Sequence, residues 1–204
     1  MPAHVCNGFN ADMGAKISLI KRHGYFMPNT SKILDYVPQP DEYTCQSACI
    51  AMMVGSTDVM GIRRSLLEAC TADSQPGSPY IMGNYLDKRV KEYCFHSAAS
   101  VIDMVNWLSE GFTLITHGYF TNGHVIVVNN HINDCFVVDD PYGEFDAPSW
   151  TYTGNKHGDD VPYSERLIYS ACVASGGKSE AASIYNGGGI DRGFGNAWVH
   201  TIRN

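Results

Sequence analysis

The chain has few apolar runs, no surplus of basic residues and no recognisable export signal. No stretch of its 204 residues approaches the roughly 20 apolar residues that cross a bilayer, so we expect no membrane span. The net charge of -7 argues against a basic surface for nucleic acid. The first residues lack the basic start and apolar stretch of a signal peptide, so we expect a cytoplasmic location at synthesis.

The sequence also lacks the cysteine pattern of a disulfide scaffold or of a zinc site. Its seven cysteines are odd in number, and no secretion signal accompanies them, so most are expected to be reduced and buried. Cys45 and Cys49 form a single Cys-x3-Cys pair with no second pair, and no His-x3-His occurs. A zinc site made of these two thiols and His124 is therefore not favoured, and we expect neither metal nor cofactor.

Apolar periodicity predicts helices in the first half of the chain and strands in the second. Residues 1–32 look irregular, and the tract around Asn186-Gly-Gly-Gly189 predicts a flexible Gly-rich loop over 175–196. This order favours one α+β domain over residues 1–204, with helices packed on an antiparallel sheet. The expected helices cover 44–54, 58–70, 80–93, 100–109 and 163–174, and the expected strands 33–37, 112–116, 124–129, 135–139 and 198–202.

The strands at 124–129 and 135–139 are close enough in sequence to form a hairpin. If the turn is centred on Ile132, His124 lies directly opposite Asp140, with Cβ atoms about 5 Å apart. The carboxylate could then accept the imidazole N–H and fix its tautomer. A slip of one residue would favour Asp139 in its place.

Cys45 begins the expected buried helix, where the helix dipole and a nearby imidazolium would lower the pKa of its thiol. The thiolate would be the nucleophile, and His124 would protonate the leaving amine and later activate water. Gln39 could supply an N–H that forms an oxyanion hole with the backbone N–H of Cys45. In isolation, Gln39 also fits a loop amide, His124 a structural histidine and Asp140, before Pro141, a turn residue.

In combination, these residues resemble the papain-like cysteine peptidases of the bacteriocin leader (double-glycine) processing type. The shared pattern covers about residues 33–145 and consists, in order, of Gln39, Cys45, Met52, Gly123-His124 and Asp140-Pro-Tyr-Gly143. The resemblance implies a papain-like fold, with a central buried helix carrying the cysteine and an antiparallel sheet carrying the histidine and aspartate. This sequence has Gln46-Ser47 where the family usually has Gly-Pro. Gln46 and Gly123 are therefore expected beside the substrate.

The expected activity is that of a cysteine hydrolase that cleaves a peptide or amide bond through a thioester. A stand-alone member would fit a phage-type peptidoglycan endopeptidase or amidase, similar to an endolysin, that acts on stem peptides and reaches the cell wall on lysis or by virion delivery. A protein-processing protease or isopeptidase is the alternative enzyme. A catalytically idle papain-like interaction or virion module is the alternative of another class.

Overall fold

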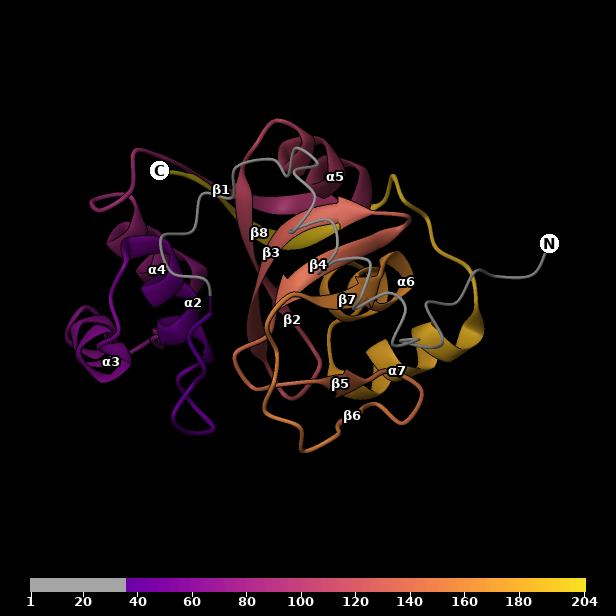
Figure 1. The fold of residues 1–204 in the computed structure, drawn as a ribbon, viewed down its shortest axis with the longest axis horizontal. Helices are drawn as coiled ribbons and strands as arrows, with labels where there is room; N and C mark the ends of the chain where they lie inside the picture. The colour runs from indigo at the N-terminus through magenta and orange to yellow at the C-terminus, as the bar shows by residue number, and fades with distance from the viewer. Residues whose placement is uncertain (1–35) are drawn as a thin grey trace, which may run out of the picture.

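The computed structural model describes residues 36–204 and is of the mixed α+β class. Its centre is a six-stranded antiparallel sheet in the order β1-β8-β2-β3-β4-β7 (Figure 1). The strands are β1 (Glu92–Ser100), β2 (Thr113–Gly118), β3 (His124–Ile132), β4 (Cys135–Asp139), β7 (Val161–Ser164) and β8 (Gly195–Arg203), with a separate pair of β5 (Phe145–Asp146) and β6 (Thr151–Tyr152).

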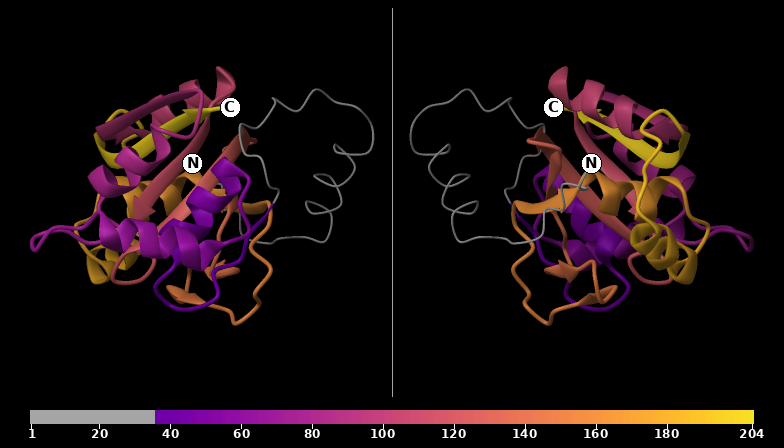
Figure 2. Two further views of the ribbon diagram at one scale, coloured as in Figure 1. Left: turned by 90° about the vertical axis from the view of Figure 1, so that its left-hand side faces the viewer. Right: turned by 90° about the vertical axis from the view of Figure 1, so that its right-hand side faces the viewer.

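Helices cover both faces of this sheet (Figures 1 and 2). On one side lie α2 (Cys45–Val54), α3 (Val59–Glu68) and α4 (Pro79–Leu86). On the other lie α5 (Val101–Ser109), α6 (Glu165–Ile168), the π-helix η1 (Tyr169–Val173) and α7 (Lys178–Gly187). Within the described residues, no single helix is long and apolar enough to cross a membrane.

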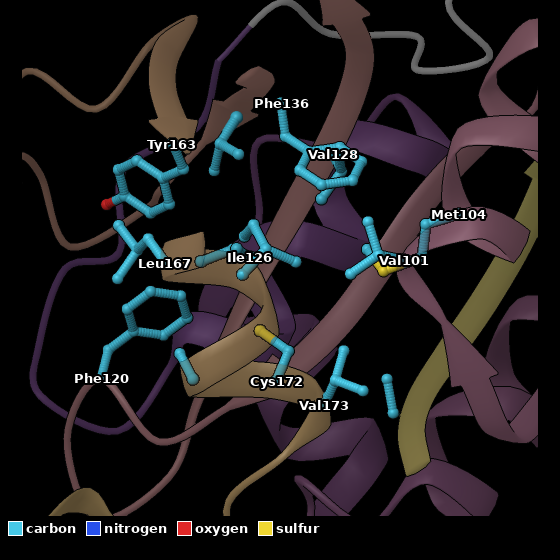
Figure 3. Close-up of a cluster of buried hydrophobic side chains, with 14 of the residues drawn as sticks. Val101, Met104, Phe120, Ile126, Val128, Phe136, Tyr163, Leu167, Cys172 and Val173 are labelled. Carbon is cyan, nitrogen blue, oxygen red and sulfur yellow. The ribbon is translucent and has the colours of Figure 1, made fainter. Parts of the chain in front are cut away.

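The alternation of side chains along the strands divides the core into two clusters. Val125 and Val127 of β3 point to the α2 side, whereas Ile126 and Val128 belong to the cluster beneath α5 and α6. Figure 3 shows this second cluster, in which Phe120 lies near Leu167 and Cys172. Strand β3 is therefore packed on both faces, which fixes the position of its first residue, His124.

Helix α2 is buried along almost its whole length, as its unbroken apolar composition predicts. Every residue from Cys45 to Met53 is buried, and Gly55 ends the helix in the left-handed conformation with a φ of 70°. Thr44 occupies the N-cap position, but its hydroxyl bonds the Asp41 carboxylate and does not cap the helix. The helix start is thus held by the preceding loop and not by a side-chain cap.

The β3–β4 hairpin has a tighter turn than expected. Ile132 pairs with Cys135, and the two turn residues Asn133 and Asp134 both have positive φ angles, which asparagine and aspartate tolerate. An irregularity between Val128 and Asn130 changes the register of the two strands a second time. The expected register centred on Ile132 is therefore wrong, and His124 and Asp140 are not a cross-strand pair.

Three other expectations differ from the structure. The helix expected over 80–93 ends at Leu86, because residues from Glu92 pair with β8 as strand β1. The helix expected over 163–174 begins only after strand β7, and the loop expected over 175–196 contains α7, with Ala181 and Tyr185 buried. Residues 1–32 lie outside the described residues, as does most of the strand expected over 33–37, whose last two residues are not in a strand.

Candidate active site

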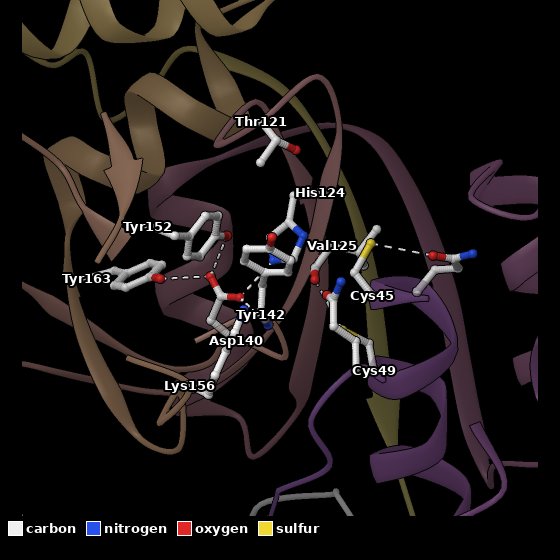
Figure 4. Close-up of polar contacts among 12 residues, drawn as sticks. Cys45, Cys49, Thr121, His124, Val125, Asp140, Tyr142, Tyr152, Lys156 and Tyr163 are labelled. Carbon is white, nitrogen blue, oxygen red and sulfur yellow. Dashed lines mark hydrogen bonds and ion pairs between the residues drawn. The ribbon is translucent and has the colours of Figure 1, made fainter. Parts of the chain in front are cut away.

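Cys45 is the first residue of α2 and lies against the start of β3 (Figure 4). Its side chain is nearly buried, with 9% of the residue exposed. The thiol donates to Oε1 of Gln46 over 3.4 Å and also interacts with His124. The helix therefore presents one thiol to the imidazole, as its position in the sequence predicts.

His124 and Asp140 meet even though they are not paired across the hairpin. His124 is the first residue of β3, and Asp140 follows the last residue of β4, so both lie at the same end of the sheet. Nε2 of His124 lies 2.7 Å from Oδ1 of Asp140. Asp139 contacts different groups, since it accepts from Nδ2 of Asn129 and from the backbone N–H of Asp160. Asp140 is thus the aspartate that orients the histidine.

Asp140 is fully buried but well satisfied by donors. Besides His124, it accepts from the hydroxyl of Tyr152 over 2.9 Å, from that of Tyr163 over 2.7 Å and from the backbone N–H of Tyr142 over 3.0 Å. Together with the contact to His124, these hydrogen bonds fix the position of the carboxylate. The sequence does not indicate the contacts of these two tyrosines, because neither has a characteristic spacing from Asp140.

The environment favours a thiolate–imidazolium pair. Burial raises the pKa of the Cys45 thiol, but the charge and hydrogen bond of His124, with backbone hydrogen bonds, lower it below its ordinary value. Burial lowers the pKa of His124, but Asp140 and Cys45 together raise it to about 10. The raised pKa keeps the His124 imidazole protonated near neutral pH, and its positive charge lowers the pKa of the neighbouring thiol. The thiolate is the reactive form of cysteine.

Aromatic rings surround the histidine. Phe120, Tyr142 and Tyr152 make edge-on contacts with the imidazole, with ring centroids 5.7 to 6.3 Å away. The ammonium of Lys156 lies 3.9 Å from the centre of the Tyr142 ring, next to the site (Figure 4). These rings shield the His124–Asp140 hydrogen bond from water, which strengthens it.

Gln39 lies close to the site but does not contact the thiol in this structure. Its backbone N–H donates to the carbonyl of Pro141 over 2.9 Å, which ties its loop to the residue after Asp140. Its side-chain Nε2 donates to the carbonyl of Asp41, and among the described residues its Oε1 is buried without a donor. The structure thus brings Gln39 next to the residue that follows Asp140, and its role as an oxyanion donor stays a prediction.

Gln46 and Gly123 flank the reactive pair in different ways. Gln46 is buried, and its Oε1 accepts from the protonated form of the Cys45 thiol. Gly123, immediately before His124, is exposed and has a φ of 145°. Its carbonyl accepts a hydrogen bond from the hydroxyl of Thr121.

Cys49, one turn after Cys45, has a different environment. Its thiol donates to the carbonyl of Val125, and burial raises its pKa well above the ordinary value. Cys49 is therefore an inert core thiol. Of the cysteines within residues 36–204, five are free and Cys135 is disulfide-bonded, so reduced thiols predominate there as expected.

Two groups within the described residues have the spacing of cation ligands, but neither includes the reactive pair. In the first, formed by His131, Asp134 and Glu165, the glutamate already pairs with the histidine and with Arg192. The second consists of Asp139, Asp159 and Asp160.

No protein-family model matches the chain, and no curated protein matches it.

Proposed function

We propose that the protein is a papain-like cysteine hydrolase in which Cys45, His124 and Asp140 form the catalytic triad. The observation that carries the proposal is the continuous contact from thiol to imidazole to buried carboxylate, with pKa shifts that favour the ion pair. The buried helix on an antiparallel sheet and the order of these residues support the papain-like assignment.

The chemistry follows from the positions of the three groups. The Cys45 thiolate attacks a carbonyl carbon, a C–S bond forms, and the C–N bond breaks as His124 gives its Nδ1 proton to the leaving amine. Water then attacks the thioester carbon while His124 takes one of its protons; a C–O bond forms, the C–S bond breaks, and the carboxylic acid leaves with the Cys45 thiolate and the His124 imidazolium restored. Asp140 holds Nε2 throughout and stabilises the imidazolium.

The oxyanion of the tetrahedral intermediate needs donors beside the sulfur. Cys45 is the first helical residue, and the first N–H groups of a helix have no acceptor within it. The backbone N–H of Cys45 is therefore one donor in our mechanism. Gln39 is the second, and it would exchange its present bond to the Asp41 carbonyl for one to the oxyanion.

For the substrate we propose the stem peptides of peptidoglycan, cleaved by a phage-type endopeptidase or amidase. The support is the resemblance of the Gln39, Cys45, Gly123-His124 and Asp140-Pro-Tyr-Gly143 pattern to stand-alone peptidases of the same type. Release of new amino groups from purified peptidoglycan by the protein, but not by its Cys45→Ala variant, is the expected result. Cleavage of casein without cleavage of peptidoglycan would instead indicate a protein-processing protease.

Thiol alkylation tests the enzyme class without knowledge of the substrate. We expect iodoacetamide to modify Cys45 at pH 6 faster than Cys94, although Cys94 is exposed and Cys45 is nearly buried. Peptide mass spectrometry would give the rate at each free thiol. His124→Ala should slow Cys45 and leave Cys94 unchanged. Slow modification of Cys45, together with no hydrolysis, would identify a non-catalytic interaction module.

A further inference from the structure

A cavity of about 350 Å³ lies between α4 and β1, away from the triad. Helix α4 lies next to α2, and β1 is the edge strand of the central sheet (Figure 1). This volume is near the lower end of the range of small-molecule sites, which suits a single side chain or a short peptide segment. Neither Cys45 nor His124 lines the cavity, so it is separate from the candidate active site.

Three aromatic rings form the walls of this cavity, those of Tyr80, Tyr93 and Phe95. Tyr80 is 69% exposed and meets Phe95 edge-on, with ring centroids 5.5 Å apart. The hydroxyl of Tyr93 is 2.8 Å from Nδ1 of His200, and the two rings are stacked. The buried histidine thus holds the Tyr93 ring in one position from behind.

Gly83 of α4 leaves room for the Tyr93 ring in this arrangement. A Cβ atom built on Gly83 would collide with the hydroxyl oxygen of Tyr93. Glycine is unfavourable inside a helix by roughly 0.5–1 kcal/mol relative to alanine, so its presence here has a cost that close packing against the tyrosine offsets.

Asp87, just after α4, is the charged residue among the described residues that line the cavity. The nearby guanidinium of Arg89 is turned elsewhere, because it lies 3.7 Å from the centre of the Tyr85 ring and donates to the Tyr85 carbonyl. The cavity therefore combines ring faces, which attract cations, with a carboxylate that carries the opposite charge.

We propose that the cavity between α4 and β1 binds an organic cation, namely an ammonium or guanidinium group on a peptide side chain. The ring faces of Tyr80 and Phe95 would contact the alkyl stem and the cation, and the Asp87 carboxylate would pair with the charge. An aliphatic side chain of the same length would gain only the apolar contacts. The site lies apart from the triad, so its binding does not depend on hydrolysis.

The test uses the full chain carrying Cys45→Ala, so that a failure of binding and a failure of catalysis are observed separately. N-acetyl-lysine methylamide is titrated and followed by NMR, with the neutral N-acetyl-norleucine methylamide as the matched ligand. We expect saturable shifts at Tyr80, Tyr93 and Phe95 with the lysine derivative. From the usual strength of exposed cation–π contacts, we expect about two- to fivefold weaker binding of the norleucine derivative.

The variants Asp87→Asn and Tyr80→Ala should each weaken binding of the lysine derivative, also by about two- to fivefold. Tyr43→Ala is the control, since Tyr43 is 70% exposed and does not line the cavity. Because Tyr80 and Tyr43 are both exposed, neither replacement should unfold the protein. Equal affinity for the two ligands, or equal effects of the Tyr80 and Tyr43 replacements, would overturn the proposal.

Discussion

Replacing Asp140 with asparagine should weaken the thiolate–imidazolium pair while leaving every other group of the site in place. The asparagine side chain has nearly the same shape, but its amide carries no charge to stabilise protonated His124. In the native protein, burial lowers the pKa of His124, and the charge of Asp140 is the largest of the effects that raise it to about 10. The replacement should therefore lower that pKa and raise the pKa of the Cys45 thiol.

The size of the effect follows from the 2.7 Å contact between Nε2 and the carboxylate. A hydrogen bond to a charged group contributes about 1.5–3 kcal/mol. Since about 1.4 kcal/mol corresponds to one pKa unit, the equilibrium moves about 10- to 100-fold from the ion pair toward the neutral thiol and imidazole. The midpoint of the pH profile of Cys45 alkylation should then rise by about one to two units.

The assay is the rate of Cys45 alkylation between about pH 4 and 9, a range that spans the ordinary pKa values of histidine and cysteine, with urea unfolding to verify that each variant is folded. Asp139→Asn is a close control, because Asp139 is equally buried but bonds Asn129 and the backbone of Asp160. Its profile should match that of the unaltered protein. An unshifted profile for Asp140→Asn, or the same shift for both variants, would refute the assigned role of Asp140.

Three further predictions concern stability and the support of the site. Burial lowers the pKa of His117 to about 4, so its contribution to stability is present above about 6.5, the ordinary pKa of histidine, and is lost as the pH falls toward 4. The urea midpoint of the native chain should be lower at about pH 5 than at about pH 7, and this decrease should be smaller in His117→Asn. His157→Asn, at an exposed position, should show the same decrease as the native chain. Gly158→Ala should reduce both stability and Cys45 alkylation, because a Cβ atom there would collide with the Asp140 carbonyl oxygen. Tyr163→Phe should cost about 1–3 kcal/mol of unfolding free energy by removing one donor to Asp140, yet Cys45 should still alkylate faster than Cys94 because the carboxylate remains.

The elements that depend on local sequence could be predicted well. Helix α2 is apolar from Ala48 to Met53, and Ser100 with Asp103 forms the capping box that begins α5 at the expected place. The contact between His124 and Asp140 was predicted correctly, although from a wrong register. It survives that error because both residues lie at the same end of the sheet, so their meeting does not require a pairing across the hairpin.

Features that depend on distant parts of the chain could not be predicted. Lys88 and Arg89 have the propensity to extend a helix, but the residues from Glu92 onward pair with β8, far along the chain, as strand β1. Tyr152 and Tyr163 come to Asp140 from β6 and β7, and only the folded sheet brings them together. The glycines that flank α7 predict a loop, whereas the structure has a helix whose Ala181 and Tyr185 are buried.

The position of β8 has a consequence for the order in which the protein folds. This strand lies between β1 and β2, so residues 195–203 separate two strands that are made about 80 to 100 residues earlier. Until β8 is inserted, β1 has no partner strand among the described residues. Strand β2 is then paired only with β3, the strand that carries His124, and its other edge is open. Pairing of such distant segments is slow, since a large loop must close first. We therefore expect the contacts of His124 with Cys45 and Asp140 to form fully only in the last folding step, when the whole sheet is complete.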